Sequence, residues 1–243
     1  MTTPPAEDPA APPVRLLIVD DDPLVRAGLT FMLGGAEDLA IVGEGADGSE
    51  VPDLVDRLRP DVVLMDIRMP TVDGLSATET LRARPGAPEI IVLTTFHADE
   101  HVLRAIRAGA AGFVLKDTPP AQIVDAVRRV ASGDPVLSPA VTRRLMDHAA
   151  GTGPGNGWGD RADRTDRARQ RIAALGERER EVATAVGRGR SNAEIAGELY
   201  LSVATVKTQV SRILARFGLN NRVQIALLVH DAGLLDDGGD GTP

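Results

Sequence analysis

Short apolar runs that alternate with longer amphipathic stretches constrain the first half of this chain more than any other feature. The runs are rich in Val, Ile and Leu, and the stretches between them have helical spacing. The predicted strands are Arg15–Val19, Leu39–Val42, Val62–Met65, Ile90–Leu93 and Phe113–Leu115. The predicted helices are Leu24–Leu33, Ser49–Leu58, Gly74–Ala83, His101–Ala108 and Ala121–Ser132. Strands that alternate with helices in this way predict an α/β domain at residues 14–132, with a doubly wound, five-stranded parallel sheet in flavodoxin-like order.

The third apolar run ends abruptly at a carboxylate. Val62–Met65 is continuous and partly β-branched, which is typical of a strand buried on both faces of a parallel sheet. Asp66 follows at the carboxyl end of that strand, where α/β sheets bind their ligands. Taken alone, this segment is equally compatible with an aspartate in an ordinary turn.

Polar residues also follow three of the other predicted strands. Asp20-Asp21-Asp22 follows the first strand, Thr94-Thr95 the fourth and Lys116 the fifth. In a flavodoxin-like order the first and third strands are neighbours, so the first acids should face Asp66. Clustered carboxylates repel one another and favour a hard cation such as Mg²⁺, and Lys116 could neutralise an anionic group on Asp66.

A glycine pattern at residues 43–48 matches G-x-G-x-x-G but follows the wrong strand for a dinucleotide site. That fingerprint belongs after the first strand, with an acid about 20 residues later. Here the pattern follows the second strand, and no acid ends a strand at that distance. Nucleotide binding is therefore not expected.

The formal net charge of -8 is unevenly distributed. Residues 14–130 carry 12 basic and 19 acidic side chains, whereas residues 171–233 carry 9 basic and 6 acidic ones. Only the second half therefore has the charge expected of a nucleic-acid-binding domain.

The sequence has no cysteine and no long apolar stretch, so we expect a soluble, cytoplasmic protein without disulfides. The tails, residues 1–13 and 236–243, are expected to be disordered.

A tether is predicted between the two halves, at residues 133–170. Ala149–Asp160 is rich in glycine and contains Trp158, the only tryptophan. Arg161–Gln170 is charged and has no apolar stripe. Such a composition is typical of a flexible linker.

Residues 171–235 contain the pattern of a four-helix, all-α domain. Glu177–Val186 is the first helix, Ser191–Glu194 is a capping box that opens a second helix reaching Leu199, and Ser202 caps a third that reaches Phe217. Asn221 caps the last helix, Arg222–Asp231, which we expect to include a dimer face. A tight turn followed by a longer helix with a small polar outer face is the geometry that enters a major groove, although helical hairpins are also common in ordinary packing.

The first half resembles a bacterial response-regulator receiver domain. The resemblance is carried by Asp20-Asp21, Asp66, Met69-Pro70, Asp73-Gly74, Thr94, Phe113 and Lys116. It implies that Asp66 accepts a phosphoryl group from a histidine kinase. It also implies that Asp21, Asp66 and the Arg68 carbonyl bind Mg²⁺, with Asp20 acting through water, and that Thr94 and Phe113 form a switch beside Lys116. Asp22 stands where the closest subfamily usually has His.

The second half resembles a LuxR-type helix-turn-helix at Gly189–Ala196 and Ser202–Thr208, and the two halves together resemble a NarL/FixJ-family response regulator. This implies base contacts from Lys207, Thr208 and Ser211, and phosphate contacts from Thr205, Ser202 and Arg222. Two positions depart from the family pattern: Gly176 replaces the usual Ser or Thr cap, and Gln209 replaces a common His.

These resemblances lead us to expect a two-component transcription factor that dimerises and binds promoter DNA when Asp66 is phosphorylated. A histidine kinase, promoter DNA and a second copy are the expected partners, and RNA polymerase is a further one. An enzyme with an aspartyl intermediate is not expected, because Arg68 stands where such phosphatases carry a general acid. The alternatives are a constitutive DNA-binding regulator whose receiver is a protein-interaction module, and a phosphate sink.

Overall fold

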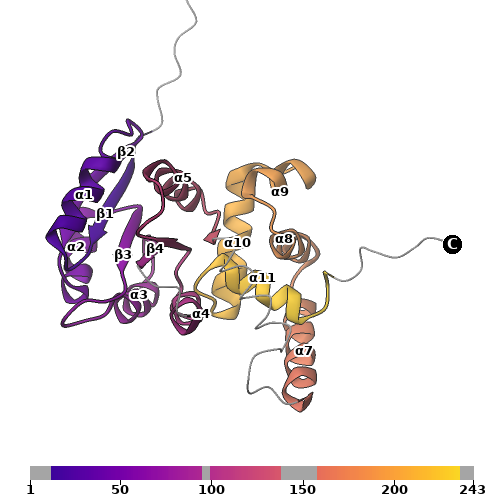
Figure 1. The fold of residues 1–243 in the computed structure, drawn as a ribbon. Helices are drawn as coiled ribbons and strands as arrows, with labels where there is room; N and C mark the ends of the chain where they lie inside the picture. The colour runs from indigo at the N-terminus through magenta and orange to yellow at the C-terminus, as the bar shows by residue number, and fades with distance from the viewer. Residues whose placement is uncertain (1–11, 95–98, 138–157, 236–243) are drawn as a thin grey trace, which may run out of the picture.

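The computed structural model describes residues 12–94, 99–137 and 158–235. These residues form an N-terminal α/β domain and a C-terminal helical domain (Figure 1). Most of the two predicted disordered tails, and residues 149–157 of the glycine-rich stretch in the predicted tether, lie outside the described residues.

The N-terminal domain has a parallel sheet in the order β2-β1-β3-β4-β5-β6, which confirms the flavodoxin-like order. Its strands are β1 (Val14–Val19), β2 (Leu39–Gly45), β3 (Val62–Asp66), β4 (Glu89–Thr94), β5 (Gly112–Leu115) and β6 (Val136–Leu137). The short β6 extends the five predicted strands, because residues in the expected tether continue the ladder beside β5.

Helices cover both faces of this sheet, because successive residues of each strand point to opposite sides. One buried cluster joins alternate strand residues to α2 (Val51–Leu58), α3 (Gly74–Arg82) and α4 (Asp99–Ala108). The other joins the remaining strand residues to α1 (Pro23–Leu33) and α5 (Pro120–Ala131). A short 3₁₀ turn, η1 (Gly48–Glu50), precedes α2. The apolar strands are therefore buried on both sides, as their sequence predicts.

The C-terminal domain is built from five helices in the described part of the chain. They are α7 (Trp158–Ala173), α8 (Glu177–Gly187), α9 (Asn192–Glu198), α10 (Val203–Phe217) and α11 (Arg222–Asp231). Ser191 and Glu194 form the predicted capping box of α9, and Ser202 caps α10 by accepting the Thr205 N–H at 3.1 Å. Gly218 ends α10 in the left-handed conformation, with φ 60°.

Helix α7 differs from the tether expected at Arg161–Gln170. Ala168 and Ile172 lie one helical turn apart and are both buried in the core of the C-terminal domain. Arg171 stacks over Phe217, with 4.9 Å between the guanidinium carbon and the ring centroid. Helix α7 therefore has a narrow apolar stripe among its charged residues. The C-terminal domain thus begins earlier in the chain than predicted.

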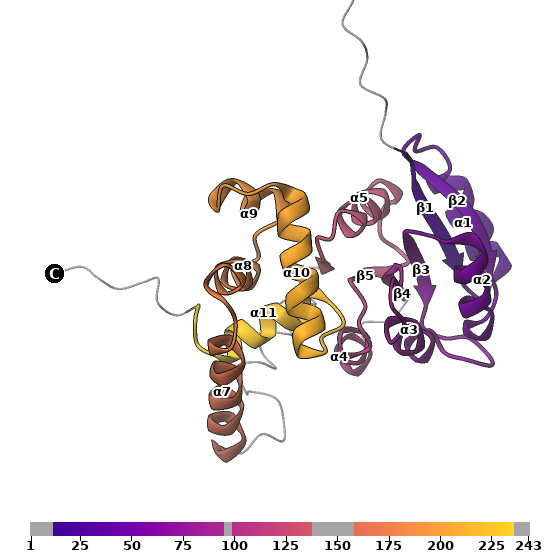
Figure 2. The same ribbon diagram turned by 180° about the vertical axis from the view of Figure 1, so that it is seen from behind.

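The two domains are in contact. Both views place α10 and α11 beside the α4 and β5 side of the N-terminal domain (Figures 1 and 2). Val223 of α11 is 5% exposed and belongs to the same buried cluster as α3 and α4, with Leu227 packed against it. Val223 and Leu227 belong to the helix that was expected to include a dimer face, and both pack within the chain instead. In the part of the chain that the structure describes, no helix is long and apolar enough to cross a membrane.

Candidate functional site

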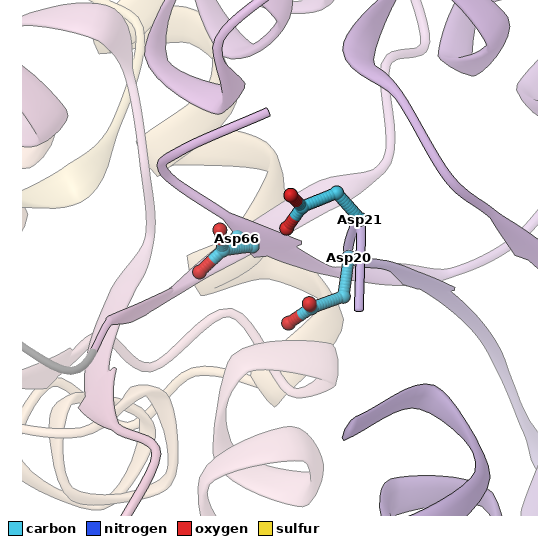
Figure 3. A group of neighbouring side chains, drawn as sticks. All are labelled: Asp20, Asp21 and Asp66. Atoms are coloured by element: carbon cyan, nitrogen blue, oxygen red, sulfur yellow. The ribbon is translucent and has the colours of Figure 1, made fainter. Parts of the chain in front are cut away.

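Three carboxylates meet at the carboxyl edge of the sheet. Asp20 follows β1, Asp21 is the next residue, and Asp66 is the last residue of β3. One oxygen from each lies within 4.8 Å of the others (Figure 3). Asp20 and Asp66 are buried, whereas Asp21 is exposed, so the cluster opens to solvent on one side. The adjacency of β1 and β3 brings together the acids that the sequence predicted to meet.

Lys116 supplies the nearest positive charge to this cluster. Its Nζ lies 2.5 Å from Asp20 Oδ2 and 2.8 Å from Asp66 Oδ1. Burial raises the pKa of Asp66, although Lys116 opposes this by favouring the carboxylate. Burial lowers the pKa of Lys116, but Asp20 and Asp66 outweigh it and leave that pKa raised. One ammonium thus faces two buried carboxylates, and the site is short of positive charge.

The donor set fits a hard divalent cation. Its ligands are carboxylate oxygens, as Mg²⁺ prefers. The buried Asp20 Oδ2 forms the ion pair with Lys116 but accepts no hydrogen bond of normal geometry from the described residues. The backbone N–H of Arg68 donates to Asp66 Oδ2 at 2.9 Å and fixes the rotamer of that carboxylate. A bound cation would therefore meet preformed oxygen ligands at this edge.

Gly74 allows helix α3 to begin directly against Asp66. A Cβ at this position would lie 1.8 Å from the Asp66 carbonyl oxygen, so no larger residue fits. Asp73 caps α3 by accepting the N–H groups of Leu75 and Ser76. The Asp73-Gly74 pair thus shapes the loop that follows Asp66.

The predicted switch residues lie on the neighbouring strands. Thr94 ends β4 and is 4% exposed. Phe113 lies on β5, is 3% exposed and belongs to the buried cluster that also contains Val223 of α11. The Phe113 ring is therefore already buried in this state, in the cluster that both domains share.

Asp47, within the G-x-G-x-x-G pattern, organises the loop beside this site. Its carboxylate accepts the N–H groups of Ser49, Thr71 and Val72, together with the Ser49 hydroxyl. These bonds hold the pKa of Asp47 well below its usual range, and the Ser49 hydroxyl is the largest contributor. The pattern therefore builds structure between β3 and α3, and sequence reasoning missed this role.

The residues predicted to contact DNA differ in their exposure to solvent. Lys207, Thr208 and Ser211 are exposed on α10, and Ser202 is exposed at its N-terminus, with Thr205 half-buried beside it. Lys207 and Ser211 also line a cavity of about 210 Å³, whose other wall includes Ala111 and Val130 of the N-terminal domain. The outer face of α10 is thus turned partly towards that domain.

Arg222, a predicted phosphate contact, is 7% exposed because it takes part in the domain interface. Its Nη1 lies 3.1 Å from Asp134 Oδ1 and 2.6 Å from Asn192 Oδ1, and a further bond joins the guanidinium to the Arg190 carbonyl. Asp134 also accepts the Asn192 N–H at 2.9 Å. Burial lowers the pKa of Arg222, and the charges of Asp134 and Glu194 oppose that shift.

A second set of bonds joins the start of α11 to the end of α4. The Asn221 amide donates to the carbonyls of Ile106 and Ala110 at 3.0 and 2.8 Å. Gln224 donates to the Ile106 carbonyl at 3.0 Å. The last carbonyls of a helix lack partners within the helix, so the C-terminal domain satisfies acceptors that α4 leaves open. These partners are more than 100 residues apart, and no sequence pattern indicated them.

Both domains match known families. The model for the response regulator receiver domain matches residues 16–128, and the model for bacterial regulatory proteins of the luxR family matches residues 173–229. Transcriptional regulatory protein LiaR of Bacillus subtilis (strain 168) is 35% identical over 217 residues, which are 89% of this chain and 97% of that protein. Response regulator protein VraR of Staphylococcus aureus (strain NCTC 8325 / PS 47) is 32% identical over 222 residues, which are 91% and 99% of the two chains.

A solved structure shares the fold of part of the chain. The crystal structure of a two-component response regulator of the LuxR family from Aurantimonas sp. SI85-9A1 covers 57% of this chain and 99% of its own, with 32% identity and a TM-score of 0.53. Together with the family matches and the full-length relatives, this similarity agrees with the acidic pocket and the helix-turn-helix described above. The chain therefore belongs to the two-component response regulators that join a receiver domain to a LuxR-type DNA-binding domain and regulate transcription.

Proposed function

We propose that a sensor histidine kinase phosphorylates Asp66 and that this frees the C-terminal domain to dimerise on promoter DNA. The observation that carries the proposal is the position of Asp66 at the sheet edge, 2.8 Å from Lys116 and beside Asp20 and Asp21. Phosphorylation of a carboxylate needs nearby positive charge, because the incoming phosphoryl group is itself anionic.

In this proposal a carboxylate oxygen of Asp66 attacks the phosphorus of a phosphohistidine on the kinase. A P–O bond forms, the P–N bond breaks, and the electron pair stays on the histidine nitrogen. Lys116 neutralises a phosphoryl oxygen, while the Arg68 N–H holds the other Asp66 oxygen in place. Asp20, Asp21, Asp66 and the Arg68 carbonyl would hold Mg²⁺, which supplies further positive charge when bound. Arg68 also leaves Asp66 without the general acid of an aspartyl phosphatase, so the modification would persist.

A small phosphodonor with Mg²⁺ tests the site directly. Intact-mass measurement should show one added phosphoryl group on the wild type and on the control Asp53→Asn, which removes an exposed acid of α2. Asp66→Asn should show none, because an amide is not a nucleophile for this step. Equal incorporation by Asp66→Asn would contradict the assignment.

Release of the DNA-binding domain is the second half of the proposal. Lys207, Thr208 and Ser211 would contact base edges, while Ser202, Thr205 and Arg222 would contact phosphates. Arg222 is bonded to Asp134, and Lys207 and Ser211 border the receiver, so the domains must separate before these groups reach DNA together. This arrangement favours phosphorylation-controlled DNA binding over both a constitutive regulator and a phosphate sink. RNA polymerase is a further proposed partner of the DNA-bound dimer.

A further inference from the structure

A second cavity lies at the junction between the two domains. It measures about 420 Å³, within the range of small-molecule sites. Arg129, Asp134 and Pro135 line it from the receiver side, and residues of α8, α9 and α11 line it from the other. The cavity therefore lies mainly on the C-terminal domain and is completed by the receiver, and neither family match assigns it a ligand.

The lining has an apolar floor. Its apolar members are Val186, Val223, Ala226, Leu227 and Leu235. Val186 and Val223 are buried, whereas Ala226, Leu227 and Leu235 are half-buried and still partly open to solvent. Covering such surface with an apolar group is favourable, so the floor fits a hydrocarbon chain or ring.

The rim of the cavity is positively charged. Arg129, Arg188 and Arg190 are exposed there. Arg190 is paired with Glu194 and Glu198, but Arg129 and Arg188 form no ion pair with any described residue.

The acids at the cavity do not offset this charge. Glu194 is bound to Arg190, and Asp134 is bound to Arg222. Arg129 donates a long hydrogen bond of 3.4 Å to the Pro135 carbonyl, which leaves its charge unpaired, so two guanidinium charges can meet an anion here.

We infer that this junction binds a small amphipathic anion, with its apolar part on the α11 floor and its carboxylate or phosphate between Arg129 and Arg188. The nearest alternative occupant is the chain's own end, Asp236–Pro243, which has three aspartates but only glycine, threonine and proline besides. That segment would supply charge without the apolar group that the floor requires.

Such a ligand would regulate DNA binding, and this consequence rests on the proposed function. A molecule that contacts both domains binds the closed state more tightly than the separated one, so it stabilises the closed state increasingly as its concentration rises above its Kd. It would therefore weaken DNA binding, and DNA would weaken its binding by the same factor.

Decanoate, below its micelle concentration, is the probe, and calorimetric titration of the unphosphorylated full chain is the measurement. We expect saturable binding at one site, with at least tenfold weaker binding of 1-decanol, which lacks the charge, and of acetate, which lacks the chain. The double variant Arg129→Gln/Arg188→Gln should bind decanoate about tenfold more weakly. Arg57→Gln, an exposed arginine of α2, is the matched control and should bind normally.

A cavity-filling variant and a truncation complete the test. Ala226→Phe should abolish binding, and its thermal unfolding curve will show whether it remains folded. Equal binding of decanol and decanoate, or unchanged binding by either cavity variant, would overturn the proposal. Binding that appears only after removal of residues 236–243 would identify the chain's own end as the occupant and would also overturn it. None of these outcomes depends on Asp66, so a failed phosphorylation test leaves them interpretable.

Discussion

At the residue scale, Asp134 connects the receiver to two groups of the DNA-binding domain. Its Oδ1 receives the backbone N–H of Asn192 and lies 3.1 Å from a guanidinium nitrogen of Arg222. Hydrogen bonds to charged groups contribute roughly 1.5–3 kcal/mol each, more than neutral ones. Because Arg222 is buried, loss of this carboxylate leaves a charge that is better satisfied in the separated state.

We therefore expect Asp134→Asn to bind DNA more tightly than the wild type when neither is phosphorylated. A shift of about 1.5 kcal/mol in the domain equilibrium corresponds to roughly a tenfold gain in affinity. Fluorescence anisotropy with a labelled DNA fragment measures it. Asp125→Asn removes an equal charge from the exposed face of α5 and should leave the affinity near that of the wild type. Equal gains by both variants would mean that charge alone, and not the interface, is responsible.

We predict that Asp47 makes a pH-dependent contribution to the free energy of unfolding. Its folded-state pKa is lowered by bonds from Ser49, Thr71 and Val72, so its stabilising effect is complete above the unfolded pKa of about 4 and declines as the pH falls through the folded pKa. Asp47→Asn should lower the free energy of unfolding at pH 7. The difference in this free energy between variant and wild type should become smaller as the pH falls below about 4. Urea unfolding at several pH values checks this, with Asp53→Asn as the control. A gap that is independent of pH would contradict the role of the charged carboxylate.

At the scale of elements, continuous apolar strands were the most predictable feature. Val62–Met65 contains no polar residue, and both faces of this strand are buried in the structure. Capping residues likewise placed the starts of α9 and α10 at Ser191 and Ser202. Helix α7 could not be predicted in this way, because Ala168 and Ile172 supply too few apolar positions to stand out among charged neighbours.

We expect the outer face of helix α10 to determine which DNA sequence the protein prefers. Lys207 is exposed on its outer face, where a base contact contributes roughly 1–3 kcal/mol of discrimination. Lys207→Ala should therefore lose preference for the selected site over random DNA. Arg216→Ala is the control, because Arg216 lies on the same helix but is bonded to Glu179 within the domain. Competition binding by the phosphorylated proteins measures both, and unchanged preference in Lys207→Ala would show that α10 does not contact bases there.

At the scale of the whole molecule, the acidic pocket could be predicted and the domain interface could not. The pocket follows from strand order, because Asp20, Asp66 and Lys116 each follow or end a strand of one sheet. The interface depends on Asn221 meeting α4 and on Arg222 meeting Asp134, in segments that sequence reasoning assigned to a cap, a DNA contact and a tether. Only the relative placement of the domains brings these groups together.

The contact between the two domains changes the mechanism by which we expect phosphorylation to control DNA binding. A flexible tether alone would limit the receiver to controlling self-association, which raises avidity through effective concentration. In the proposed mechanism, the contacts between α4 and α11 would add an intramolecular step, because α4 follows the strand that ends at Thr94. Any rearrangement at Thr94 that moves α4 would weaken the bonds to Asn221 and Gln224, release α11 and uncover Val223 and Leu227 for a second copy.

The DNA affinity of the full chain with and without a phosphodonor tests the central claim most directly. The ligand is a DNA fragment selected from a random pool by the phosphorylated protein, and the readout is fluorescence anisotropy at fixed salt, since salt alone changes affinity steeply. We predict that phosphodonor and Mg²⁺ raise the affinity of the wild type at least tenfold and leave Asp66→Asn unchanged. Equal affinity of the wild type in both states, or an equal gain by Asp66→Asn, would contradict the account.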